Sequence, residues 1–297
     1  MDVTITGLTK QYRRGVRALD GIDLRIGAGT TGLLGANGAG KTTLMRILTG
    51  ILRPSTGTVT VGGHDLGSAT GRLGVKRMLG YLPQEIDLYP DLTGRELLDY
   101  FALLKGVDDP RARREQIDAL LELVGLTQAA RRRIGGYSGG MKRRIGIAQA
   151  LLGDPKLIVV DEPTAGLDPE ERMRFRALLA SLGDNRTVVL STHILEDVAQ
   201  TCPEVAVLAA GRLVYRGATT KLVDAARGRT FQVRTAGVPP TGDLAVVNAQ
   251  VIPEGTVYRI VTDTPPPTAQ PTDPTLEDGY VALMRQTRSH VVVGAAR

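Results

Sequence analysis

The sequence predicts an α/β fold with a buried parallel sheet, and three observations support this prediction. Two uninterrupted apolar runs, residues 157–160 and 187–190, are typical of strands that are covered on both faces. A helix-like segment over 169–182 separates them, so strands and helices alternate along the chain. A third apolar run, 31–34, leads into a glycine-rich loop that opens a helix-like segment over 43–48. This order of strand, loop and helix is typical of α/β proteins that bind phosphate groups.

The first 62 residues are predicted to be rich in β-structure, with one helix. Residues 3–6 alternate between apolar and polar side chains, and residues 58–61 do the same after the turn at 54–57. A short apolar run at 79–82 predicts a further strand, which ends at Pro83 because proline cannot donate to a strand ladder.

The chain between Thr93 and about Leu126 changes to helical spacing of its apolar residues, which predicts two amphipathic helices. Thr93 is the candidate N-cap of the first helix, because Glu96 stands three residues later, where a capping box requires it. A glycine-rich turn at 135–140 then precedes a helix that runs through Leu152.

The last third of the chain predicts a second, smaller unit. A helix over 194–200 and a hairpin turned at Gly211 follow the second buried strand. After about residue 220 come short strand-like runs, a proline-rich linker at about 264–274 and a closing helix. We therefore expect a main unit over 1–218 and a small α+β extension over 219–297.

The composition restricts the class of protein. With 297 residues, 42% of them hydrophobic and 23% charged, the chain is an ordinary globular protein that can hold one large domain and a small appendage. It has neither an apolar run long enough to span a membrane nor the pattern of a signal peptide, so we expect it in the cytosol. The single cysteine, Cys202, excludes an internal disulfide, and we expect it to be a small apolar filler.

The net charge of +6 is compatible with a nucleic-acid or anionic-surface partner, but its distribution argues against one. The basic residues are spread along the chain, and their densest clusters, 111–114 and 131–133, lie in helix-like or loop segments that we interpret as solvated faces. Aromatic residues make up 4% of the chain and tryptophan is absent, which disfavours a platform for stacking single-stranded bases. We expect no nucleic-acid partner.

Residues 35–42 fit the phosphate-binding pattern G-x-x-x-x-G-K-[ST] at every fixed position. The glycines let backbone N–H groups turn toward a polyphosphate, and the helix N-terminus adds the positive end of its dipole. Lys41 would then reach the outer phosphates, and the Thr42 hydroxyl would ligate Mg²⁺. A glycine-rich turn followed by chance by Lys-Thr is the alternative, which the flanking strand and helix disfavour. The predicted nucleotide contacts in this loop are Gly35, Asn37, Gly38, Ala39, Gly40, Lys41, Thr42 and Thr43.

Two carboxylates follow the first buried strand. The strand delivers Asp161 rigidly to its carboxyl end, beside the phosphate loop, where a ligand of Mg²⁺ is needed. Glu162 comes next and can polarise the attacking water or accept its proton. The alternative is an exposed turn with two acids, and the four apolar residues before them argue against it.

Three further features are weak signals when taken singly. Ser138, Gly139 and Gly140 open a helix with a nest of donors, although a simple helix-opening turn has the same sequence. His193 follows the second buried strand and so lies at the same sheet edge as the carboxylates, where it could donate to a γ-phosphate oxygen; a lone histidine is more often structural. Gln84 could supply an amide oxygen to Mg²⁺ or to water, but alone it is an ordinary surface residue.

Together and in this order, these residues resemble the ATP-binding subunit of ABC transporters over roughly residues 1–218. The family's motifs correspond to the Walker A loop 35–42, the Q-loop residue Gln84, the signature 137–141, the Walker B strand 157–161 with catalytic Glu162, the D-loop 165–168 with Asp168, and the switch residue His193. Tyr12 stands where the family places the aromatic residue that stacks on adenine; the alternative is a tyrosine at the end of a strand.

The resemblance implies a P-loop NTPase cassette with a RecA-like core, an N-terminal antiparallel β-subdomain and a helical subdomain at about 85–137. It implies ATP and Mg²⁺ as cofactors, with Thr42, Gln84 and Asp161 as metal ligands. Lys41, Gln84, Glu162 and His193 would be the catalytic residues.

The resemblance also implies two partners. In this family the signature of one copy completes the ATP site of a second copy in a head-to-tail dimer, so Ser138 and Gly140 would contact the γ-phosphate held by the other Lys41. The opening Tyr137 and closing Met141 differ from the most common Leu and Gln. With the Lys-Arg-Arg that follows, they resemble the branch that serves ABC-2-type exporters, including antibiotic and multidrug systems.

The implied function is ATP hydrolysis that powers transport, and we expect export, through a separate transmembrane permease at the cytoplasmic face of the membrane. A soluble ABC-type ATPase acting on DNA or ribosomes is the main alternative, but such proteins usually carry two cassettes, a long coiled coil or zinc-binding insertions. A small-molecule phosphotransferase would lack the Ser-Gly-Gly nest and the D-loop.

Overall fold

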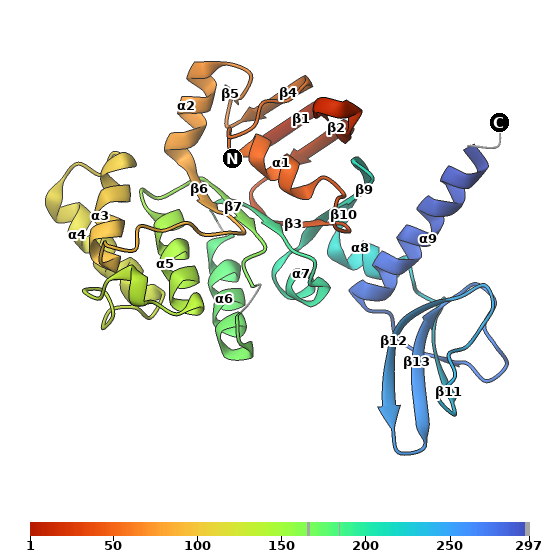
Figure 1. Ribbon diagram of the computed structural model, residues 1–297. Helices are drawn as coiled ribbons and strands as arrows, with labels where there is room; N and C mark the ends of the chain where they lie inside the picture. Colours follow the sequence, from red (N-terminus) through yellow and green to blue (C-terminus); the bar gives the residue numbers. More distant parts are fainter. Residues whose placement is uncertain (165–166, 184, 295–297) are drawn as a thin grey trace. The chain divides into compact units, whose positions relative to one another are not determined.

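The computed structural model describes residues 1–164, 167–183 and 185–294. It divides into two compact units, Met1–Arg216 and Gly217–Arg297 (Figure 1). No helix within the described ranges is long and apolar enough to cross a membrane.

The first unit begins with an antiparallel sheet in the order β2-β1-β4-β5. Its strands are β1 (Val3–Gln11), β2 (Arg17–Ile26), β4 (Thr56–Val61) and β5 (His64–Asp65). The short turn η1 (Arg13–Gly15) joins the first two strands. β1 runs well beyond the predicted residues 3–6, and its pairing register shifts between Ile5 and Leu8, where the predicted strand stops. Gly7 lies there with φ of 54°, and such a bulge breaks the alternation that predicts strands.

The main sheet has the order β10-β9-β3-β8-β7-β6 and confirms the predicted α/β class. Its strands are β3 (Gly29–Leu34), β6 (Leu79–Leu82), β7 (Leu157–Asp161), β8 (Thr187–Ser191), β9 (Glu204–Ala209) and β10 (Arg212–Ala218). β3 pairs in parallel with β8 and β9, and β7 pairs in parallel with β6 and β8. Every residue of β7 and β8 is buried, as their apolar runs predict. Ala210 and Gly211 make the predicted tight turn between β9 and β10, with φ of 47° and 79°.

The helices associated with this sheet are α1 (Lys41–Leu48), α2 (Ala69–Met78), α5 (Gly139–Leu151), α6 (Pro169–Leu182) and α7 (Leu195–Thr201). The sequence predicted all of them except α2. That helix contains Gly71 and Gly74, which have poor helix propensity, and it buries only Gly71 and Val75. Its apolar period is therefore too weak to be recognised.

Two helices, α3 (Gly94–Leu104) and α4 (Pro110–Leu123), form the predicted helical segment at one end of the first unit (Figure 1). Thr93 and Glu96 make the predicted capping box in full. Leu97, Leu98 and Leu121 are buried completely, so the apolar faces of these helices point into the unit. The short turn η2 (Ile134–Gly136) leads from them toward α5.

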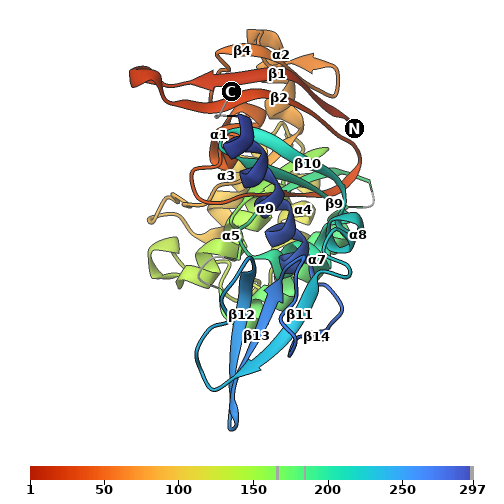
Figure 2. The same cartoon turned by 90° about the vertical axis from the view of Figure 1, so that its right-hand side faces the viewer.

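The second unit has its own antiparallel sheet in the order β12-β13-β11-β14 (Figure 2). Its elements are α8 (Thr219–Asp224), β11 (Thr230–Thr235), β12 (Ala245–Ile252), β13 (Gly255–Val261), β14 (Gln270–Pro271) and α9 (Leu276–Gly294). Phe231, Val233, Tyr258 and Ile260 form one buried cluster. The proline-rich segment at 264–274 carries the short strand β14, which pairs with β11.

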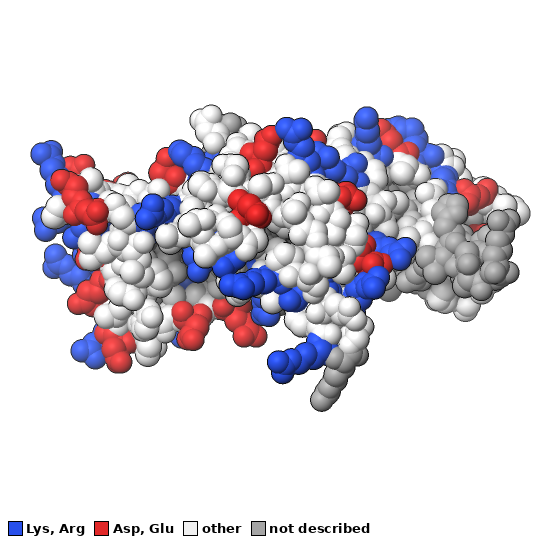
Figure 3. Space-filling view, turned by 90° about the horizontal axis from the view of Figure 1, so that it is seen from above, with Lys and Arg blue, Asp and Glu red and all other residues white. Residues whose placement is uncertain are grey.

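Charged side chains of both signs are interspersed over the face shown in Figure 3. Many exposed arginines pair with nearby acids, for example Arg111 with Glu115 and Arg174 with Glu170. These ion pairs are exposed on both sides, as is typical of a solvated surface.

Candidate nucleotide-binding site

Four predicted motifs meet at one edge of the main sheet. β3, β8 and β7 are neighbours and run in parallel, so their carboxyl ends lie at the same edge. The glycine loop follows β3 and His193 follows β8. Asp161 is the last residue of β7, and Glu162 comes directly after it. Gln84 follows β6, the next parallel strand.

In the phosphate loop, the neighbouring backbone leaves no room for a side chain at Gly35 and Gly40. A Cβ atom on Gly35 would lie 2.5 Å from the carbonyl oxygen of Leu208, and one on Gly40 would lie 2.6 Å from that of Ala18. Both glycines also have positive φ, 153° and 106°. Gly40 is the N-cap of α1 and has no side chain to cap it, so the N–H groups of the first turn are open to an anion.

Lys41 lies inside this loop. The residue is 7% exposed, and its Nζ donates to the carbonyl oxygens of Gly35, at 2.6 Å, and Ala36, at 3.2 Å. Burial lowers the pKa of Lys41, while the charges of Glu162 and Asp161 oppose that shift. The ammonium is thus a cation placed among backbone groups at the end of β3.

Tyr12 lies beside the same loop. Its hydroxyl is 3.3 Å from the Thr43 hydroxyl, in the first turn of α1. Its side chain is exposed, and Lys10 Nζ lies 5.5 Å from the ring centroid. The ring is therefore close to the phosphate loop and can offer a face to a nucleobase.

Asp161 provides an oxygen suited to a metal ion. The residue is 1% exposed, and its Oδ1 has no hydrogen-bond partner within the described part of the chain. Burial raises its pKa, which a nearby cation would offset. Thr42, which is half-buried, is the second residue of α1 and follows Lys41 directly. Carboxylate and hydroxyl oxygens suit Mg²⁺, which usually keeps water and phosphate oxygens as its other ligands.

Glu162 and His193 contact each other directly across the edge of the sheet. The Glu162 carboxylate bonds His193 Nδ1, and the Glu162 N–H donates to the Ser191 carbonyl at 2.8 Å. Glu162 is 9% exposed, whereas the His193 side chain is 59% exposed. The acid is therefore held within the protein, and the histidine projects from the edge.

Sequence reasoning missed Arg143 on α5. The residue is buried, and it donates to backbone carbonyls on both sides of Glu162 and in the Gln84 segment. Arg143 lies within the basic run 142–144, and nothing in such a run tells which member is buried. Partners that are backbone atoms leave no mark in the sequence.

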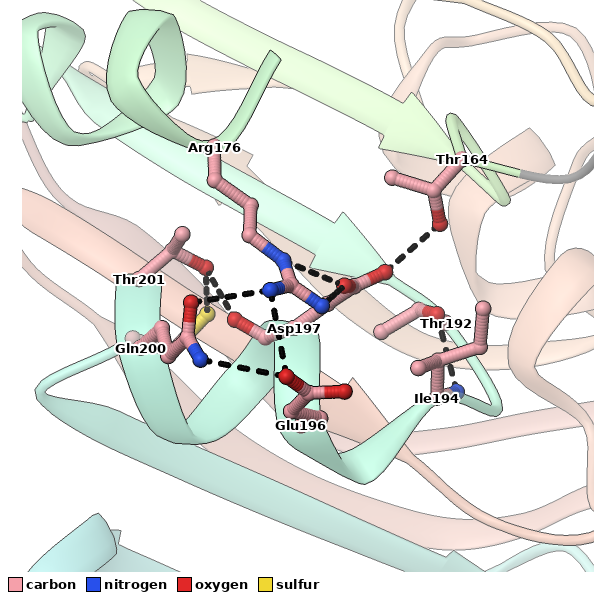
Figure 4. A network of polar contacts seen from close by, with 9 residues as sticks. Thr164, Arg176, Thr192, Ile194, Glu196, Asp197, Gln200 and Thr201 are labelled. Atoms are coloured by element: carbon pink, nitrogen blue, oxygen red, sulfur yellow. Dashed lines mark hydrogen bonds and ion pairs between the residues drawn. The ribbon is translucent and has the colours of Figure 1, made fainter. Parts of the chain in front are cut away.

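A second missed group links the segment after Glu162 to α7 (Figure 4). The Thr164 hydroxyl donates to Asp197 Oδ2 at 2.6 Å, and Arg176 Nε donates to Asp197 Oδ1 at 2.7 Å. Asp197 is 2% exposed, so this is a buried and fully engaged carboxylate. It joins α6, α7 and the residues that follow the two predicted acids.

The signature residues open α5 and face solvent. Ser138 is its N-cap, and its Oγ accepts a hydrogen bond from the Met141 N–H at 3.2 Å. Ser138 and Gly139 are exposed, and no atom lies within 4 Å of where a Cβ of Gly139 would be. Tyr137, in contrast, is buried and donates to the Ala129 carbonyl at 2.8 Å.

Gly140 and the D-loop lie close to α6. A Cβ on Gly140 would come 2.3 Å from Glu171 Oε1, so the Glu171 carboxylate lies directly against this glycine. Asp168 caps α6 by accepting from the Glu171 N–H at 2.8 Å. Ala165 and Gly166, the first half of the predicted D-loop, lie outside the described residues.

Comparisons with known proteins place this site in context. The family described as ABC transporter matches residues 19–165. The chain is 40% identical over 222 residues to the daunorubicin resistance ATP-binding protein DrrA3 of Streptomyces coeruleorubidus. This match covers 74% of this chain and 69% of DrrA3. It is 35% identical over 231 residues to the linearmycin resistance ATP-binding protein LnrL of Bacillus subtilis, covering 77% and 73%.

A solved structure shares the fold of most of the chain. It is the dimeric, post-hydrolysis state of the ATP-binding cassette MJ0796, bound to ADP and Pi. The match covers 73% of this chain and 98% of that one, with 25% identity and a TM-score of 0.68.

Proposed function

Because the chain belongs to the family of ABC transporter ATP-binding proteins, we propose that it is the ATP-hydrolysing subunit of an exporter and drives a separate transmembrane permease. The observation that carries the proposal is the carboxyl edge of the main sheet. Three adjacent parallel strands bring the phosphate loop, the two acids and His193 together there. The drug-resistance names of the relatives speak for export and against a soluble ATPase that acts on DNA or ribosomes.

The nucleotide is held by the phosphate loop in this proposal. The N–H groups of the loop and of the first turn of α1 bind the phosphates, and Lys41 moves its ammonium from loop carbonyls to phosphate oxygens. Tyr12 stacks on the base. Thr42 and Asp161, with Gln84, hold Mg²⁺, and the chemistry that the ion supplies when bound is neutralisation of phosphate charge.

Hydrolysis is assigned to the pair at the end of β7 and β8. The Glu162 carboxylate orients a water molecule and accepts its proton while the oxygen attacks the γ-phosphorus and ADP leaves. His193 uses Nδ1 to contact Glu162, which leaves Nε2 for a γ-phosphate oxygen. The products are ADP and inorganic phosphate.

A second copy of the chain is the first proposed partner. The exposed Ser138 and Gly139, with the partly buried Gly140, offer N–H and hydroxyl donors to a phosphate on another surface. The relative MJ0796 is dimeric in its ADP- and Pi-bound state, which supports a dimer of this chain around nucleotide. ATP would then favour the closed dimer and hydrolysis would release it.

The permease is the second proposed partner, and it would hold the chain at the cytoplasmic face of the membrane. We assign part of its docking surface to residues 87–92. Tyr89 is 52% exposed and packs edge-on against Tyr100, with ring centroids 6.0 Å apart. Exposed aromatic residues of this kind are enriched at protein interfaces.

The proposal is tested by purifying the tagged chain from detergent-solubilised membranes of cells that express it and measuring phosphate release. We expect ATP-dependent phosphate release without any acceptor substrate, and co-purification of a multi-spanning membrane protein. Transfer of phosphate to a small molecule, or co-purification with ribosomes or DNA only, would contradict it.

A further inference from the structure

Arg143 is a buried cation whose partners are unusual. The residue is 6% exposed, and within the described residues it makes no ion pair with a carboxylate side chain. Burial lowers its pKa, and the more distant charges of Asp161 and Glu162 counteract that effect. A buried charge is costly unless its donors are all used, so its surroundings must be organised around it.

The donors of Arg143 are used on five carbonyl oxygens. Nε donates to Pro163 at 2.8 Å, and Nη2 donates to Asp161 at 3.2 Å and to Glu162. Nη1 donates to Gln84 at 2.7 Å and to Pro83 at 3.3 Å. One side chain on α5 therefore joins the turn 161–163 to the segment that carries Gln84.

The turn 161–163 has a backbone that needs such support. Glu162 has φ of 50°, in the left-handed region that a residue with a Cβ rarely adopts. Pro163 follows it, and a residue before proline prefers an extended backbone. Strained backbone of this kind persists only when neighbouring groups fix it. The carbonyls of all three residues accept from Arg143, and the Glu162 N–H donates to Ser191.

We propose that Arg143 is a positioning residue for hydrolysis: it fixes the left-handed turn that carries Glu162 and couples this turn to the Gln84 segment. The inference rests on the proposed function, since it takes Glu162 as the general base. If the Gln84 segment shifts relative to the turn 161–163, Arg143 must lose its hydrogen bonds either to the turn or to that segment. The position of Gln84 and the aim of Glu162 are thereby linked through one guanidinium.

The test compares three variants. Arg143→Met removes the donors and the charge at similar length, and Arg143→Lys keeps the charge but cannot span both segments. Arg113→Met is the matched control. The Arg113 side chain is 13% exposed and bonds Asp99 and the Val107 carbonyl in the helical segment, away from the sheet edge.

Two readouts separate positioning from general stability. We expect kcat to fall about 10- to 100-fold in Arg143→Met, the scale of a small misplacement of a reacting group, with ATP affinity within about twofold of wild type. The kcat of Arg143→Lys should lie between that of Arg143→Met and that of the wild type. Arg113→Met should lower the melting temperature and leave kcat unchanged.

Amide exchange gives a readout that does not need turnover. In Arg143→Met the Glu162 amide should exchange about tenfold faster or more, while the amides of β7 keep their protection. Arg113→Met should leave both unchanged. Unchanged exchange at Glu162, or a kcat loss no larger than that of Arg113→Met, overturns the role of Arg143. Absence of phosphate release by the wild type contradicts the proposed function instead, and the exchange result still decides the inference.

Discussion

The carboxyl edge of the main sheet and the N-terminus of α5 carry the two halves of the proposed site, and they are built in opposite ways. At the sheet edge, Lys41, Asp161 and Glu162 are all less than a tenth exposed, and the first and last bond their own chain. At α5, Ser138 and Gly139 are exposed, and within the described ranges the Ser138 side chain hydrogen-bonds only to the Met141 N–H, as a helix cap. The sheet edge is organised in advance by the fold, whereas the signature serine and the glycine after it face solvent.

Among the variants that test this difference, replacement of the proposed base Glu162 should have the largest effect on turnover. Glu162→Gln keeps the shape of the side chain but removes its ability to accept a proton, so turnover should fall about 10²- to 10⁴-fold. ATP binding should persist, because the phosphate loop is untouched, and an ATP-bound dimer should accumulate. Phosphate release and light scattering measure the two effects. Turnover near that of the wild type would refute the role of Glu162.

Replacing the lysine of the loop tests the sheet edge at its binding step. Lys41→Ala removes a charged donor to the phosphates, and we expect ATP affinity to fall about 10- to 100-fold by calorimetry. This loss should appear in the single chain, without dimer formation. An unchanged affinity would count against the whole interpretation of residues 35–42.

Replacing the signature serine should have the smallest effect and the opposite pattern. Ser138→Ala should leave ATP affinity of the single chain unchanged and lower turnover about tenfold, because one charge-assisted donor to a phosphate is lost in the dimer. The matched control is Ser68→Ala. Ser68 is also an exposed N-cap, and its Oγ accepts from the Gly71 N–H at 2.9 Å. Both variants should lose about 1 kcal/mol of stability as capping residues.

If Ser138→Ala and Ser68→Ala lose the same turnover, Ser138 acts only as a helix cap and not as a phosphate donor. A loss confined to Ser138→Ala, and only at concentrations that allow a dimer, would support the division between the two regions.

The sequence predicted the sheet core and the helices with strong periods. The buried runs at 157–160 and 187–190 were predicted as parallel strands because strands covered on both faces are mainly apolar. The capping box at Thr93 was predictable because its chemistry is local. β2 and α2 were missed, since a register shift near Gly21 in β2 and the glycines in α2 disturb the periods on which recognition depends.

The proposed site was predictable only where chemistry dictates a side chain. The phosphate loop and the acids have fixed residue types at fixed spacing, so they could be located, although their roles stay predictions. Arg143 and Asp197 could not be found in this way. One contacts backbone carbonyls, and the other joins helices whose packing the sequence pattern does not reveal.

Cys202 has a practical consequence for studying the two regions. It is 3% exposed, and burial raises the pKa of its thiol to about 12, so it stays protonated and shielded from reagents at neutral pH. A probe attached to a cysteine introduced at Ser138 would therefore report from that position alone, without prior removal of the native thiol. The distance between the two Ser138 positions of a nucleotide-bound dimer becomes measurable while Cys202 stays in place.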